Sequence, residues 1–154
     1  MNKGKRFEQN FKASIPKGVF CYRLRDGTSS WSSTDATRFQ ATNVCDFILA
    51  DGEYVVLAEL KNHKGKSLPL SCIRENQLKE LLKADEFVFI RPLIIVNFED
   101  LDECYALSVE WVNDFIELGQ RKSISVSDMR EYGTEIKCTK KKVNTVYDLS
   151  VLFE

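Results

Sequence analysis

Two apolar runs separated by an Asp-Gly pair constrain the fold of this chain more than any other feature. Residues 44–50 and 53–61 are rich in β-branched and aromatic side chains, and an Asp-Gly pair between such runs is a strong signal for a β-hairpin. With a loop of two or four residues, alternation of side chains places Asp46 on the same face as Glu59 and Lys61. We therefore expect two carboxylates and an amine to converge on one side of this hairpin.

The register of the hairpin sets the spacing of the acids. A two-residue loop pairs Ala50 with Glu53 and Asp46 with Leu57, so that Asp46 and Glu59 become diagonal neighbours roughly 7–8 Å apart at the backbone. A three-residue loop separates them. A Glu-x-Lys sequence by itself is common on exposed strands with alternating charges. Both faces of these strands are otherwise apolar, however, and a buried acid pair needs a reason.

These residue types match the needs of metal-dependent phosphodiester hydrolysis. Mg²⁺ takes oxygen ligands and usually keeps several waters, so that one or two carboxylates hold it beside a phosphate. The ion polarises the phosphate and helps to generate hydroxide from water. A neighbouring lysine orients the water or stabilises charge in the transition state. Asp46, Glu59 and Lys61 are therefore candidate catalytic residues.

Composition limits the remaining classes of protein. A chain of 154 residues that is 44 % hydrophobic predicts one globular domain over residues 1–154. The net charge of −1 neither requires nor excludes nucleic acid, because local patches matter more than the total. Five scattered cysteines without a C-x-x-C pair favour neither a disulfide framework nor a zinc site. The lack of a signal peptide and of a long apolar stretch predicts a soluble, cytoplasmic protein with no membrane contact. The single histidine, His63, lies in a lysine-rich loop and argues against a histidine-based triad.

An N-terminal helix is expected over residues 3–14, with Phe7 and Phe11 on its buried stripe. Glu8 lies at the border of that stripe. Its side chain either points towards the sheet or pairs with Lys12, one turn further on at the surface. The sequence leaves both readings open.

Residues 26–42 are rich in Ser and Thr and show no periodicity, which predicts a flexible or stalk-like loop. Trp31, Arg38 and Phe39 lie within this segment. They either contact nucleic acid by stacking and ion pairing or anchor an ordinary loop.

A second helix is expected from a cap at Ser71 to about Ala84. Gln77 lies on its apolar side, where an amide needs hydrogen-bond partners. It is either a boundary residue bonded to backbone or a residue that reaches the acidic site.

Further along, Arg91-Pro92 interrupts an apolar run, which predicts an edge strand or a bulge there. Ser127 is expected to cap a short helix that ends at Gly133. The resulting order α-β-β-β-α-β-β-α predicts an α/β (α+β) fold with a mixed central sheet flanked by helices.

The acidic motif resembles that of the PD-(D/E)XK nuclease superfamily, and most closely its RecU-type Holliday-junction resolvases of Gram-positive bacteria and their phages. The resemblance combines the motif from Asp46 to Glu59-Leu60-Lys61 with Glu8 on a preceding helix and with Gln77. It extends along most of the chain through segments at residues 4–8, 61–70, 119–124 and 133–136.

The resemblance implies a restriction-endonuclease-like fold and a homodimer that nicks opposing strands of four-way DNA junctions with Mg²⁺, for which Mn²⁺ substitutes. Asp46 and Glu59 would ligate the metal together with the backbone carbonyl of Leu60. Lys61 would assist the attacking water, while Glu8 and Gln77 would complete and support the acidic cluster. The candidate DNA contacts are basic residues: Lys5, Arg6, Arg38, Lys64 and Lys66.

Two other functions stay open. In the first, the chain is a nuclease of the same superfamily that acts on flaps, nicks or duplex ends. In the second, it is a binding module that keeps the basic surface but performs no chemistry. The combination of Glu8, Asp46, Glu59 and Lys61 argues against the binding module, because a protein that only binds DNA has no need of a buried acid pair.

Overall fold

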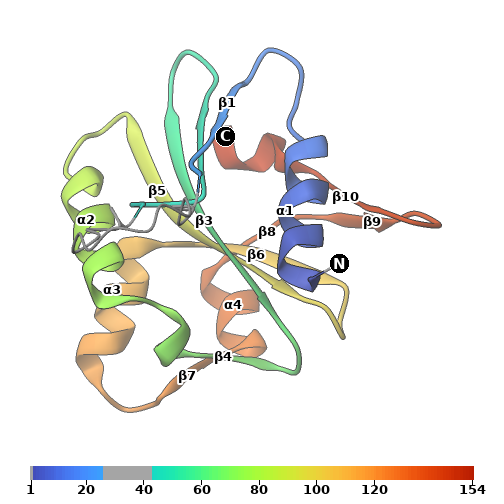
Figure 1. The fold of residues 1–154 in the computed structure, drawn as a ribbon. Helices are drawn as coiled ribbons and strands as arrows, with labels where there is room; N and C mark the ends of the chain where they lie inside the picture. The colour runs from blue at the N-terminus through green and yellow to red at the C-terminus, as the bar shows by residue number, and fades with distance from the viewer. Residues whose placement is uncertain (1, 26–42) are drawn as a thin grey trace, which may run out of the picture.

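The computed structural model describes residues 2–25 and 43–154. These residues form three layers, with one mixed sheet between two layers of helices (Figure 1). The strand order is β1-β2-β3-β5-β6-β8, with β3 and β5 parallel and the other neighbours antiparallel. This arrangement confirms the predicted mixed sheet flanked by helices. The strands are β1 (Phe20–Arg23), β2 (Phe47–Ala50), β3 (Val55–His63), β5 (Ile90–Phe98), β6 (Glu103–Ser108) and β8 (Thr134–Glu135).

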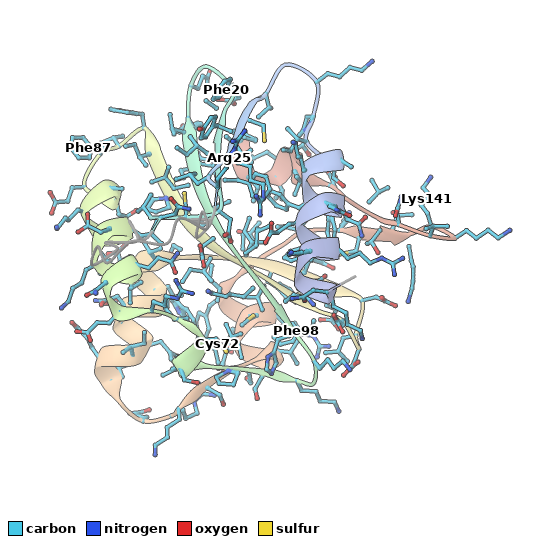
Figure 2. All side chains as sticks on the ribbon, in the orientation of Figure 1. Phe20, Arg25, Cys72, Phe87, Phe98 and Lys141 are labelled. Atoms are coloured by element: carbon cyan, nitrogen blue, oxygen red, sulfur yellow. The ribbon has the colours of Figure 1, made fainter. Side chains whose placement is uncertain are left out.

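Helices cover both faces of this sheet, and side chains fill the space between the layers (Figure 2). One face carries α1 (Lys3–Ala13), and the other carries α2 (Glu75–Asp85), α3 (Val109–Leu118) and α4 (Val126–Tyr132). Of the helices in the described ranges, none has the length and apolar character needed to cross a membrane. The remaining elements are short: β4 (Ser67–Pro69) with β7 (Ser123–Ser125), β9 (Cys138–Lys140) with β10 (Thr145–Tyr147), and the 3₁₀ helices η1 (Leu70–Cys72) and η2 (Leu149–Phe153).

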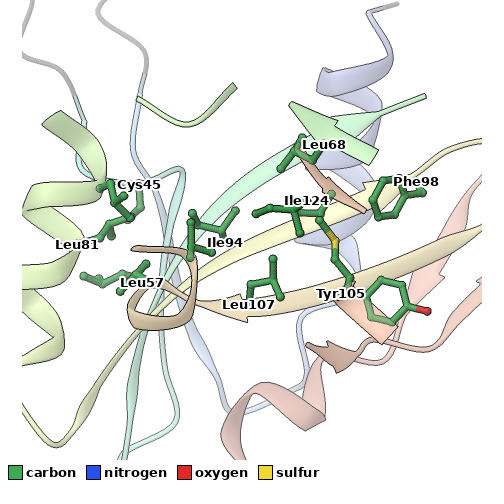
Figure 3. Close-up of a cluster of buried hydrophobic side chains, with 14 of the residues drawn as sticks. Cys45, Leu57, Leu68, Leu81, Ile94, Phe98, Tyr105, Leu107 and Ile124 are labelled. Atoms are coloured by element: carbon green, nitrogen blue, oxygen red, sulfur yellow. The ribbon is translucent and has the colours of Figure 1, made fainter. Parts of the chain in front are cut away.

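The two central strands are buried on both faces. Leu57 and Ile94 face the α2 side and belong to the cluster shown in Figure 3, whereas Ala58 and Ile95 face α1. Strands that are buried on both sides read as nearly continuous apolar runs, as this sequence does. Glu59, in the buried part of β3, is therefore held in a largely apolar environment.

The hairpin between β2 and β3 has a four-residue loop, so that Ala50 pairs with Val55. The pairing of Ala50 with Glu53 is therefore wrong by two residues. Asp51 explains the longer loop, because its Oδ1 accepts hydrogen bonds from the backbone N–H groups of Glu53 and Tyr54, both at 2.9 Å. Such side-chain bonds mimic a backbone turn.

The longer loop brings the acids closer than predicted. Phe47 pairs with Ala58, so that the next residues outward, Asp46 and Glu59, lie next to each other. The predicted pairing of Asp46 with Leu57 is wrong, but a shift by two residues preserves the face.

Two predicted helix starts and one predicted interruption differ from the structure. Ser71 lies in η1, and α2 begins only after Arg74, without a side-chain cap. The cap of α4 is Ser125 rather than Ser127, because Asp128 completes a capping box with Ser125. Pro92 lies inside the central strand β5, one residue before the ladder with β6 begins, where its missing N–H leaves that ladder intact.

Candidate active site

Asp46 lies directly before β2, at the point where the ladder between β2 and β3 ends. Its backbone N–H donates to the carbonyl of Ala58 at 3.0 Å. Its carboxylate accepts a hydrogen bond from the backbone N–H of Leu60, with a distance of 2.7 Å to Oδ2. Main-chain contacts thus hold the carboxylate against the free edge of β3.

Glu59 projects from β3 towards α2 and is only 6 % exposed. Its two carboxylate oxygens have different donors. Lys61 Nζ lies 2.7 Å from Oε1, and Gln77 Nε2 lies 2.8 Å from Oε2. The structure therefore brings Gln77 from the apolar side of α2 into the acidic site, and it places Lys61 on the same face of β3 as Glu59.

The carbonyl of Leu60 faces the same strand edge as Asp46. Within a strand, the N–H and C=O of one residue point to the same side, and the Leu60 N–H points to Asp46. Beyond Ala58 no residue of β2 pairs with this edge. The Leu60 carbonyl thus faces the side of β3 on which the Asp46 carboxylate lies, and its role as a metal ligand stays a prediction.

The electrostatics of this cluster are unbalanced. Burial, followed by the negative charge of Glu59 and, more weakly, that of Glu8, raises the pKa of Asp46 to about 7. The hydrogen bond from Leu60 and the charge of Lys61 oppose this rise without cancelling it. An added cation would favour the ionised pair.

The chemistry of the donors fits a divalent metal that prefers oxygen. No group of three or more His, Cys, Asp or Glu side chains suited to a metal exists within residues 2–25 and 43–154. Two carboxylates and a backbone carbonyl remain, and Mg²⁺ is usually held by one or two carboxylates with its other positions left to water and substrate phosphate.

Glu8 reaches the sheet from α1 and does not pair with Lys12. Its Oε2 accepts two hydrogen bonds from Arg23 of β1, at 3.0 Å from Nε and 2.5 Å from Nη2. Arg23 pairs in register with Phe47, next to Asp46. Glu8 therefore borders the acid pair, and its own charge is paired with the Arg23 guanidinium.

Sequence reasoning missed Arg23. A usable signal was present, since alternation in β1 places Arg23 on the face opposite the exposed Phe20 and Tyr22, together with Cys21, which packs against the core below α1. A charged residue on the inward face of a strand calls for a partner.

Four of the five predicted DNA contacts lie within the described residues. Lys5, Arg6, Lys64 and Lys66 are exposed, and Arg6 donates to the carbonyl of Val143. Arg38, like Trp31 and Phe39, lies outside the described residues. Contact of these side chains with DNA stays a prediction.

A mixed sheet between helices, with an acid pair and a lysine on its central hairpin, defines a nuclease with a restriction-endonuclease-like fold. The chain matches the family model described as "RecU: Recombination protein U" over residues 2–149. It therefore belongs to the RecU family, which confirms the resemblance.

Two individual proteins are similar to this chain. The chain is 29 % identical over 170 aligned residues to the SPbeta prophage-derived uncharacterized protein YotM of Bacillus subtilis (strain 168), and the match covers 98 % of this chain and 85 % of YotM. A similar solved structure is that of Archaeoglobus fulgidus Hjc, described as a Holliday junction resolvase from an archaeal hyperthermophile. Its TM-score is 0.57 at 16 % identity, with 86 % of this chain and 95 % of Hjc covered, so this likeness concerns the fold.

Proposed function

We infer that this RecU-family chain is a Holliday-junction resolvase, an endonuclease that cuts four-way DNA junctions with the help of a divalent metal. The observation that carries the inference is the close pair of the half-buried Asp46 and the buried Glu59, joined by Lys61 and Gln77 through the hydrogen bonds of Glu59. Two carboxylates held this close in a largely apolar sheet oppose folding, so their presence calls for a functional reason.

Each residue has a distinct role in this proposal. Asp46, Glu59 and the Leu60 carbonyl would hold Mg²⁺, which would supply charge neutralisation at the phosphate and activate water for attack. Lys61 stabilises negative charge that develops on the scissile phosphate. Gln77 fixes the orientation of the Glu59 carboxylate through its 2.8 Å hydrogen bond.

We place Glu8 at the border of the reacting group, where Arg23 restrains its carboxylate. Glu8 is thereby available as a third acid without adding its full charge to the pair. In the proposal it helps to position the attacking water, and Arg23 keeps its side chain turned towards the sheet.

Symmetric cutting of a four-way junction supports a homodimer, because two incisions related by a two-fold axis need two identical sites. Large apolar side chains are exposed at one end of the sheet. Phe20 and Phe87, labelled in Figure 2, are 62 % and 52 % exposed, and Val88 is 94 % exposed. Exposed apolar surface of this kind is typical of interfaces.

A cleavage assay with three labelled substrates tests the proposal: a synthetic four-way junction, a flap and a linear duplex of the same sequence. The expected result is Mg²⁺-dependent nicking of the junction at symmetric positions, with much slower cutting of the other two. Equal rates on all three would favour a general nuclease of the same superfamily. Binding to DNA without cutting of any substrate would favour the binding module.

A further inference from the structure

A second polar region lies on the other side of the sheet, away from the acid pair. It is a cavity of about 260 Å³ between the N-terminal half of α1 and the β9–β10 hairpin. The cations that line it come from two places far apart in the sequence, Lys3 and Arg6 on the helix and residues 140–142 on the hairpin. The region is thus assembled by the fold and is not a local run of lysines.

The floor of this cavity is a continuous chain of hydrogen bonds. Tyr147 donates through its hydroxyl to Asn97 Oδ1 at 3.2 Å, and Asn97 Nδ2 donates to Asn62 Oδ1 at 2.7 Å. Asn62 Nδ2 in turn donates to Glu99 at 2.5 Å, and Glu99 holds Lys3 at 3.0 Å. No buried side-chain N or O atom of the described residues lacks a partner, so the polar groups of the floor are satisfied within the protein.

Positive charge exceeds negative charge around the cavity. Glu99 and Asp102 are its carboxylates, and they are occupied by Lys3 and Lys140 at 3.0 and 3.3 Å. The five lining cations therefore leave three charges uncompensated. Lys141 and Lys142 make no ion pair with any residue that the structure describes, and the bond of Arg6 goes to a carbonyl on the hairpin.

The hairpin has the shape of an arm. In Figure 1, β9 and β10 extend past α1 and away from the rest of the molecule, and Figure 2 shows Lys141 reaching outward from the tip. The turn is closed by a 2.7 Å hydrogen bond from the Lys141 N–H to the Asn144 carbonyl. A two-stranded ribbon of this width can lie along the groove of a DNA duplex while its lysines contact phosphates.

α1 connects this arm to the acidic site. Glu8 and Arg6 are two residues apart, so they point to different sides of a helix that is about 10–12 Å across with its side chains. Arg6 contacts the arm through the Val143 carbonyl, and the charge of Glu8 acts on Asp46, so the two sides of α1 face the arm and the acid pair.

We propose that the β9–β10 arm, with Arg6 of α1, binds backbone phosphates of a DNA arm that flanks the cleaved position. This inference rests on the proposed function and deepens it. The arm adds affinity that does not depend on DNA sequence, and it orients the duplex relative to the acid pair. The ligand is the DNA phosphodiester backbone.

The test compares two double variants in an Asp46→Asn background, so that the junction is bound but not cut. Lys141→Ala/Lys142→Ala removes two uncompensated charges of the arm. Lys79→Ala/Lys83→Ala makes the same change of charge on α2, where both lysines are exposed. Affinity for a synthetic four-way junction is measured from low to moderate salt.

The arm variant is expected to make the negative slope of log K against log salt shallower by about 1.8, since each phosphate contact contributes roughly −0.9. The α2 variant should leave the slope unchanged. If the slope is unchanged in the arm variant while Asp46→Asn protein with an intact arm binds the junction, the proposed role of the arm is wrong and the proposed function still stands. Failure of the wild-type protein to bind any junction overturns both.

Discussion

Strand β3 carries two polar clusters that differ in electrostatic balance. Facing α2, Glu59 and the neighbouring Asp46 share one lysine, and the pKa of Asp46 rises to about 7. Facing α1, Asn62 belongs to a chain of amides that ends on Glu99. Burial raises the pKa of Glu99. The hydrogen bonds from Lys3 and Asn62 more than offset this rise, so the pKa of Glu99 lies below its usual value.

The difference teaches which cluster is complete. The amide chain has donors matched to acceptors and needs nothing more, so we read it as a structural floor. The acid pair has more negative charge than its surroundings stabilise, so we read it as a site that is completed by a cation. Substitutions should therefore lower activity on the side of the acid pair and lower stability on the side of the amide chain.

The largest effect is expected for Glu59→Gln. It removes a proposed metal ligand and the partner of both Lys61 and Gln77, and the rate of junction cleavage should fall by about 10³-fold or more, the equivalent of about 4 kcal/mol. Glu53→Gln is the matched control, because this exposed glutamate lies in the loop of the same hairpin. Single-turnover cleavage with excess enzyme measures both, and a comparable loss in the control would contradict the assignment.

Asp46→Asn should stabilise the metal-free protein. The folded state raises the pKa of Asp46 from 3.8 to about 7, so between these pH values it binds more protons than the unfolded state, and stability falls as pH rises. At about 1.4 kcal/mol per unit, the penalty above pH 7 is at most roughly 4 kcal/mol.

Thermal unfolding in EDTA from pH 4 to pH 8 measures this effect. The wild-type protein should lose stability across that window, and Asp46→Asn should lose less. Asp114→Asn, an exposed position on α3, is the control. Parallel curves for Asp46→Asn and wild type would argue that the carboxylate is not strained.

Lys61→Met should lower the cleavage rate by about 10²-fold, because it removes charge stabilisation at the phosphate but leaves both carboxylates in place. Affinity for the junction should change little. Lys17→Met, at an exposed position, is the control. A drop in affinity as large as the drop in rate would place Lys61 among the DNA contacts instead.

The smallest effect is expected on the amide side. Asn97→Ala leaves the Tyr147 hydroxyl and the Asn62 amide oxygen without their partner, which should cost about 1–3 kcal/mol of unfolding free energy. Chemical denaturation measures it, with the exposed Asn76→Ala as control. Cleavage at a temperature where the variant is folded should stay close to wild type, and a loss above tenfold would break the division between the two sides.

Much of the site was predictable because alternation along a strand depends on parity alone. Asp46, Glu59 and Lys61 meet although the loop has four residues and not two, since a shift by two preserves the face. Gln77 was identifiable as a polar residue on an apolar helix stripe.

Other features depend on partners that lie far apart in the sequence. The bond between Glu8 and Arg23 forms only when α1 packs across β1, so the sequence alone left Glu8 undecided. The cavity between α1 and the β9–β10 arm is lined by residues that are far apart in the sequence, from Lys3 to Tyr147. Pro92 was misplaced because its tolerance in β5 depends on where the neighbouring strand ends.

A magnesium titration of junction cleavage tests the central claim most directly. Wild-type protein and Asp46→Asn are compared on the same four-way junction, after it is confirmed that both bind it with similar affinity in EDTA. The account predicts that incision by the wild-type protein rises from none to saturation with Mg²⁺. With Asp46→Asn the junction should stay uncut throughout, or its cutting should need far more Mg²⁺. Equal cutting by both proteins, or wild-type cutting that persists in EDTA, would contradict it.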